Sequence, residues 1–144
     1  MKTEKSLKVI LLFIVLGEYQ NGKREGSGTL IWPDKSKYIG NFEEDEMHGE
    51  GEFLWPSGRE YKGDWYKGKM HGNGVLKYED GNLYKGHFID DERSGQGLFY
   101  WSDGKMYDGE WYKNKQHGVA TLELPNGHKV TAEFKNGEKI RYIN

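Results

Sequence analysis

Residues 61–83 read Tyr61-Lys-Gly63-Asp-Trp65-Tyr-Lys-Gly68-Lys-Met-His71-Gly72-Asn-Gly74-Val-Leu-Lys-Tyr78-Glu-Asp80-Gly81-Asn-Leu83, and this stretch recurs along most of the chain. A step of 23 residues aligns Tyr38, Tyr61, Tyr84 and Tyr107, then Gly40, Gly63, Gly86 and Gly109, then Phe42, Trp65, Phe88 and Trp111. A fixed period of this length predicts a repeat array.

The repeats are predicted to be β-hairpins. In the template, Tyr61, Gly63 and Trp65 alternate with polar residues, and the same period of two continues through Gly72 and Gly74, as expected for strands with unlike faces. The predicted repeats are 15–37, 38–60, 61–83, 84–106 and 107–129, with a partial sixth at 130–135 and a C-terminal cap at 136–144. We therefore predict an all-β fold, a single elongated antiparallel meander of five to six hairpins and about eleven strands.

One face of this sheet carries both the aromatic residues and the glycines. A single sheet has no facing layer that could bury the rings of Tyr61 and Trp65. We therefore expect neighbouring aromatic side chains to lie across bare backbone at glycines such as Gly72 and Gly74. Between hairpins, Ser-Gly, Asp-Gly and Asn-Gly pairs supply the positive φ that tight turns need.

The composition disfavours several classes of function. The chain has 144 residues, 31% of them charged, a formal net charge of −2 and no cysteine. The absence of a basic field argues against a nucleic-acid partner, and the absence of cysteine excludes disulfides and thiolate zinc sites. Because the carboxylates cluster in turns and no Gly-x-Ser-x-Gly elbow or dinucleotide fingerprint occurs, we expect no catalytic site and no cofactor.

Three histidines of one column, His48, His71 and His117, raise the question of a metal site. Adjacent hairpins lie about 10 Å apart, whereas side chains that share one zinc ion must approach within about 4 Å of each other. We therefore expect no metal site, and instead a structural histidine that closes each hairpin.

The N-terminal segment 1–14 leaves three interpretations open. Three lysines precede an apolar run at 9–16, which is too short to span a bilayer as a helix. The segment could be a secretory signal cut before Glu18, a strand or helix that extends the array, or a peripheral membrane anchor. A cytoplasmic or membrane-associated location is favoured, with secretion as the alternative.

The unit Tyr-x-Gly-x-Trp, followed by Gly-Lys-x-His-Gly-x-Gly and Asp-Gly, resembles the MORN (membrane occupation and recognition nexus) repeat. Residues 61–83 match it almost completely, and the likeness extends from 15 to about 135. The resemblance implies an elongated, non-catalytic β-ribbon. Such ribbons serve as accessory modules for membranes, protein partners or self-association in phosphatidylinositol-phosphate kinases, junctophilins and some SET-domain methyltransferases.

The turn inside each hairpin carries a charge whose sign alternates along the array. Basic turns at 23–24, 67–69 and 113–115 are separated by acidic turns at 43–46 and 90–92, so neighbouring turns should attract each other modestly. We expect a scaffold or adaptor for a protein partner or for self-association. The alternative is a module that binds anionic phospholipid, such as a phosphoinositide. The residues predicted to contact lipid or partner are Lys67, Lys69, Lys113, Lys115, Trp65 and Trp111.

Overall fold

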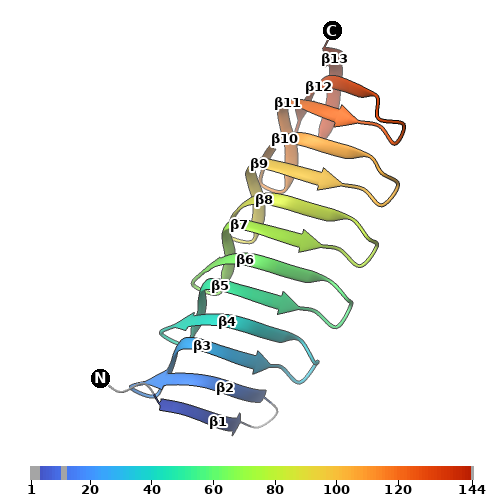
Figure 1. Ribbon diagram of the computed structural model, residues 1–144. Coiled ribbons are helices and arrows are strands. Elements are labelled where there is room, and N and C mark those ends of the chain that lie inside the picture. The colour runs from blue at the N-terminus through green and yellow to red at the C-terminus, as the bar shows by residue number, and fades with distance from the viewer. Residues whose placement is uncertain (1–3, 11–12, 144) are drawn as a thin grey trace.

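The computed structural model describes residues 4–10 and 13–143, which form a single antiparallel sheet with the strands in chain order (Figure 1). The strands are β1 Glu4–Ile10, β2 Phe13–Gln20, β3 Lys23–Ile31, β4 Lys37–Glu43, β5 Glu46–Leu54, β6 Glu60–Tyr66, β7 Lys69–Lys77, β8 Leu83–Ile89, β9 Glu92–Tyr100, β10 Met106–Tyr112, β11 Lys115–Glu123, β12 Lys129–Lys135 and β13 Glu138–Ile143. The predicted all-β meander is confirmed. The described strands number thirteen and not about eleven, because β1 and β13 extend the sheet at its two ends.

Two kinds of turn join the strands. The tip turns lie inside the hairpins, at residues 21–22, 44–45, 67–68, 90–91, 113–114 and 136–137, and both residues of each have positive φ. Such a two-residue turn matches the twist of the paired strands. The connecting turns join successive hairpins, as at 55–59, where Trp55 N–H donates to Arg59 O at 3.0 Å and Gly58 N–H to Trp55 O at 3.1 Å.

A continuous row of glycines crosses the sheet from β2 to β10. Each glycine is paired with the next in the row Gly17, Gly28, Gly40, Gly51, Gly63, Gly74, Gly86, Gly97 and Gly109. Beside the row the register shifts within the hairpin: Gly63 pairs with Gly74, but Trp65 pairs with Met70. The extra residues form a bulge at which a strand can bend sharply.

The bulge of the third full hairpin shows how the bend is held. Gly72 has a φ of +81°, a conformation that glycine adopts without strain. The Oδ2 of Asp64 accepts a hydrogen bond of 2.9 Å from Asn73 N–H across the bulge. In Figure 1 the hairpins bend in the same way, so that the tip turns lie behind the front part of the sheet. The sheet thereby becomes a trough, and its inner face is called the aromatic groove below.

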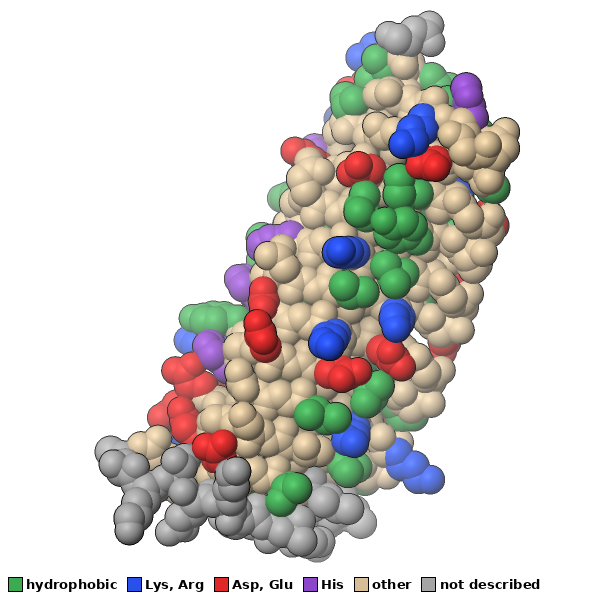
Figure 2. All heavy atoms as spheres, in the orientation of Figure 1, with side chains coloured by type: hydrophobic (Ala, Val, Ile, Leu, Met, Phe, Trp, Pro, Cys, Tyr) green, Lys and Arg blue, Asp and Glu red, His purple; other side chains and the backbone are tan. Residues whose placement is uncertain are grey.

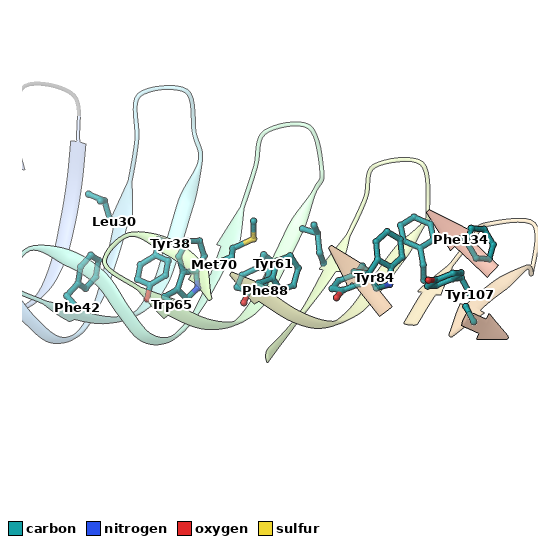
Figure 3. Close-up of a cluster of buried hydrophobic side chains, with 14 of the residues drawn as sticks. Leu30, Tyr38, Phe42, Tyr61, Trp65, Met70, Tyr84, Phe88, Tyr107 and Phe134 are labelled. Atoms are coloured by element: carbon teal, nitrogen blue, oxygen red, sulfur yellow. The ribbon is translucent and has the colours of Figure 1, made fainter. Parts of the chain in front are cut away.

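The core occupies this groove (Figure 3). The tyrosine column is fully buried, each of its members having 0% exposure: Tyr38, Tyr61, Tyr84 and Tyr107. A Cβ placed on Gly74 would lie only 2.4 Å from the ring of Tyr61, so that ring lies directly on the glycine backbone, as predicted. The same prediction is wrong for Gly72, where a Cβ would meet the Asp64 carboxylate at 2.7 Å and no ring. The hydroxyl of Tyr61 donates to Asp64 O at 2.8 Å, and its ring meets Trp65 and Phe88 edge to face, each at 5.2 Å. Such contacts add stability beyond that of burial alone.

Candidate functional site

The rim of the aromatic groove next to the connecting turns is also aromatic. Its members, one from each hairpin and all partly buried, are Trp32, Trp55, Tyr78 and Trp101. The guanidinium of Arg59 lies between two of them, 4.8 Å from the Trp55 ring and 5.4 Å from the Tyr78 ring. Its Nε is buried and has no hydrogen-bond partner within the described residues. The rim therefore offers partly buried rings to a partner, while the Arg59 Nε–H is enclosed beneath them.

A second guanidinium lies inside the groove. Arg93 lies 4.4 Å from the Trp111 ring and 5.6 Å from the Phe99 ring. It donates from Nη2 to Asn114 O at 2.9 Å, and burial among the rings lowers its pKa. Because its Nε and Nη2 both donate to Asn114 of the next hairpin, Arg93 helps to hold the array together.

The tip turns are linked from one hairpin to the next. Asp91 N–H donates to Met70 O at 2.9 Å, and Met70 N–H donates in return to Asp91 Oδ1 at 2.9 Å. The same exchange joins Arg24 and Asp45, where Arg24 Nε also donates to the Asp45 carboxylate at 3.2 Å. Burial alone would raise the pKa of Asp45, but the hydrogen bonds and charge of Arg24 lower it overall. Contacts between oppositely charged tips therefore stabilise the stack.

The histidine column links hairpins as well. His48 Nδ1 accepts a hydrogen bond of 3.3 Å from Lys67 N–H in the next tip turn, while His48 Nε2 lies 2.9 Å from Glu43 Oε2. His71 Nδ1 likewise accepts from Asp90 N–H at 3.4 Å. The prediction that the histidines of this column close their own hairpins is incomplete, because His48 and His71 also hold the hairpin that follows. Within the described part of the chain, no three His, Cys, Asp or Glu side chains are grouped so that they could hold a metal ion.

The groove opens into a hollow at its N-terminal end, where the tyrosine column begins with Val15. Val15 has no ring, and a hollow of about 590 Å³ is lined in part by its side chain. We call this space the Val15 hollow. Its walls are mainly apolar, with a polar edge at the first tip contact: Val15, Tyr19, Leu30, Trp32, Phe42 and Met47, and then Arg24, Asp45 and Glu46, with Gly22 and Gly68.

The structure separates the predicted lysines from the predicted tryptophans. Trp65 and Trp111 lie inside the groove with 5% exposure, and their Nε1–H groups donate to the carbonyls of Gly51 and Gly97 at 3.1 Å and 3.2 Å. The lysines lie exposed at two tips: Lys67, Lys69, Lys113 and Lys115. The rings that accompany them are the preceding residues on the outer face, Tyr66 and Tyr112.

These two tyrosines were not singled out from the sequence. Tyr66 and Tyr112 are 46% and 56% exposed, and the ammonium groups of Lys67 and Lys113 each lie 5.4 Å from the neighbouring ring. The signal was available, because a residue next to an inward-facing tryptophan in a strand must face outward.

No helix in residues 4–10 and 13–143 is long and apolar enough to cross a bilayer.

The geometry defines the chain as a repeat protein of stacked hairpins, in which a bent sheet encloses an aromatic groove. The sequence profile of the MORN repeat matches residues 16–37, 38–58, 61–83, 84–106 and 107–129, and the chain belongs to the MORN repeat family.

Solved structures that are similar to this chain include two TCP domains. The SAS-4 (dCPAP) TCP domain of Drosophila melanogaster, in complex with a proline-rich motif of Ana2 (dSTIL), has 13% sequence identity and a TM-score of 0.42 over 84% of this chain and 79% of that one. The TCP10 domain of Danio rerio CPAP has 14% identity and a TM-score of 0.34 over 91% of this chain and 72% of that one. No curated protein sequence matches the chain significantly.

Proposed function

We propose that the chain is a non-catalytic scaffold that binds a protein partner in the aromatic groove, with the Val15 hollow receiving an apolar side chain of that partner. The observation that carries the proposal is the hollow itself. Its volume of about 590 Å³ lies within the usual range for ligand sites, about 300–1,000 Å³. Trp32 and Met47, which both line the hollow, offer the rigid ring and the adaptable thioether that recur at protein-binding surfaces.

The apolar walls and the polar edge of the hollow would have different roles in binding the partner. The apolar walls supply affinity for a Leu, Met or Phe side chain. At the polar edge, Glu46 places a carboxylate where a backbone N–H group or a basic side chain of the partner can meet it, while the Asp45 carboxylate is held by Arg24. A partner segment in extended conformation could then continue along the rim toward Trp55. This division is typical of sites in which apolar burial binds and a few polar groups orient.

Filling the hollow is expected to abolish binding without harming the fold. Val15→Tyr would introduce the residue that the other repeats carry, over the glycines Gly17 and Gly28 that the first hairpin already has. Peptides enriched from a displayed random library on the wild-type protein should bind Val15→Tyr at least about tenfold more weakly by calorimetry, equivalent to about 1.4 kcal/mol. Val119→Tyr is the matched control, because Val119 is 57% exposed on the opposite face.

The contrary outcomes are specific. Enriched peptides that bind Val15→Tyr as tightly as the wild type would place the site elsewhere. A library that yields no peptide with an apolar anchor would remove the hollow as a protein-binding site. Peptides that lose affinity equally for Val15→Tyr and Val119→Tyr would point to a general surface effect.

A second candidate function is attachment to anionic phospholipid, which the exposed pairs Tyr66–Lys67 and Tyr112–Lys113 favour. A tyrosine beside a lysine suits the interface between lipid headgroups and water. The two pairs lie two hairpins apart, and the acidic tip Asp90-Asp91 stands between them. Attraction to the membrane should therefore be modest and sensitive to salt.

Flotation with vesicles tests this candidate. Vesicles of phosphatidylcholine containing a phosphoinositide should carry the wild type at low salt, and Lys67→Glu/Lys113→Glu should reduce the bound fraction several-fold. Lys62→Glu/Lys85→Glu is the matched control, since these two exposed lysines lie within β6 and β8, away from the tips. Equal losses for both double variants, or no flotation of the wild type, would contradict a lipid site at the tips.

A further inference from the structure

The outer face of the sheet carries an apolar cluster that the groove does not use. Figure 2 shows apolar side chains gathered on the outer face of the sheet, with Lys, Asp and Glu side chains around them. The cluster consists of Val75, Leu83, Leu98, Tyr100 and Met106, of which Tyr100 is 40% exposed. We call it the outer patch. It is centred on β9, which contributes both Leu98 and Tyr100.

Charged residues flank the outer patch in a pattern whose signs are reversed by a half-turn, so that each charge would fall opposite its complement. The cross-strand row through Tyr100 runs Glu60, Lys77, Leu83, Tyr100, Met106, Glu123, Lys129. If a second copy is rotated by 180° about an axis along β9, Lys77 faces Glu123 of that copy, and Glu60 faces Lys129. Leu83 then faces Met106, and the two Tyr100 rings meet at the axis.

The same two-fold axis also pairs the residues of the neighbouring cross-strand row. It runs Lys62, Val75, Lys85, Leu98, Asp108, Thr121, Thr131. The half-turn sets Lys85 opposite Asp108, Val75 opposite Thr121, and Leu98 opposite itself. One axis therefore pairs opposite charges in both rows and brings no like charges together among the paired positions.

Within one chain these flanking charges are only locally paired. Lys77 Nζ lies 3.7 Å from Glu60 Oε2, and Lys129 Nζ lies 3.5 Å from Glu123 Oε2. The two lysine side chains are 60% and 63% exposed, so each ion pair can accept a further partner. Exposed pairs of this kind contribute little alone, whereas networks of several charges contribute more.

We propose that the outer patch binds a second copy of this chain, forming a two-fold symmetric dimer with its axis along β9. A self-complementary surface is what a two-fold interface requires. The rows cover six strand spacings from β6 to β12, about 29 Å. Only two rows take part, which gives an interface at the small end of specific ones, below about 1,200 Å² in total. The dimer should therefore form and dissociate with concentration, and it leaves the aromatic groove of each copy free.

Sedimentation velocity across the micromolar range tests the dimer. Tyr100→Glu sets two negative charges against each other at the axis and should raise the dimer dissociation constant at least about tenfold. Tyr66→Glu is the matched control, because Tyr66 is 46% exposed on the outer face near a tip, outside the patch. The control should dimerise like the wild type.

Exchanging the charges at positions 77 and 123 distinguishes loss of the dimer contact from loss of the fold. Lys77→Glu or Glu123→Lys alone sets like charges opposite each other across the axis and should weaken the dimer, while Lys77→Glu/Glu123→Lys restores opposite charges there and should recover it. A double variant as weak as the singles would overturn the proposed axis. The proposed surface would be overturned if the wild type stays monomeric throughout. It would also be overturned if Tyr100→Glu leaves the dimer unchanged, which is the result expected if the copies pair through their end strands instead.

Discussion

Gly74→Val is expected to lower the free energy of unfolding by about 3 to 5 kcal/mol. The new Cβ would lie 2.4 Å from both Cε2 and the hydroxyl of Tyr61. The ring cannot move away easily, because it is 0% exposed and is held by a hydrogen bond to Asp64 O and by edge contacts with Trp65 and Phe88. Denaturant unfolding followed by tryptophan fluorescence measures the loss.

The neighbouring residue supplies the control. Asn73 faces outward from the same strand and is exposed, and only its backbone N–H takes part in the bulge. Asn73→Val should change stability by no more than about 0.5 kcal/mol. If both variants lose the same free energy, the effect comes from valine in this strand and not from the ring. Tyr61→Val, which removes the ring, should make Gly74→Val far less costly in the double variant.

The chain itself shows what one added methyl does. Repeat five has Ala120 where earlier repeats have glycine, and a Cβ on Gly109 would lie 2.4 Å from its Cβ. In β10 and β11 the register break falls between Asp108 and Glu110, so Gly109 has no partner on β11, although it pairs with Gly97 of β9, whereas Gly63 and Gly74 remain paired. The methyl group of Ala120 is therefore accommodated in repeat five by the loss of one residue pairing between β10 and β11.

The periodic features of the fold could be predicted because they depend on contacts close in sequence. The alternation around Gly63 fixes which face each side chain takes, and residues 67–68 fix the tip. The step of 23 residues then repeats the result along the chain. The burial of Tyr61 over Gly74 followed from the same alternation, since both lie on one face of one hairpin.

Features that depend on contacts between hairpins were harder to predict. The bond from Lys67 N–H to His48 joins residues in separate repeats, and no local pattern in the sequence marks it. The tip Glu44-Asp45 adopts positive φ at both residues without glycine, at 51° and 71°. Its contacts with Arg24 and Glu25 of the preceding hairpin help to hold it there.

In the sequence, the only sign of the candidate site is that the first repeat departs from the tyrosine column. Val15 stands in the tyrosine column, but the hollow beside it also depends on Trp32 and Met47, which come from other strands. Its volume could be known only once the bend had brought these strands together. Similarly, the outer patch depends on strand register, because a shift of one residue would move Leu98 and Tyr100 to the other face.

Alkali is expected to destabilise the protein increasingly above about pH 10, because the tyrosine column must stay neutral to remain buried. Burial raises the pKa of Tyr107 to about 12 and raises that of Tyr38, Tyr61 and Tyr84 further above the ordinary value of 10.0. Each hydroxyl also donates to a backbone carbonyl, as Tyr61 does to Asp64 O, and a phenolate has no proton to donate.

The direction of the effect follows from proton linkage. Below pH 10 the tyrosines are neutral in both states, and their contribution to stability is fully present. Above pH 10 the unfolded chain releases phenolic protons while the folded chain retains them, so stability falls by about 1.4 kcal/mol per pH unit for each tyrosine. At pH 11 the four together cost about 5 kcal/mol, which is a large part of the stability of a domain of this size.

Circular dichroism and tyrosinate absorbance, recorded together from pH 8 to pH 12, measure this effect. The phenolates of the column should appear only as the strand signal is lost. Tyr61→Phe removes one of the four groups and should reduce the dependence of stability on pH by about a quarter, or about 1.4 kcal/mol per pH unit. If all ten tyrosines ionise while the strand signal persists, the column is accessible to solvent and its rings do not require the neutral state to stay on the glycine row.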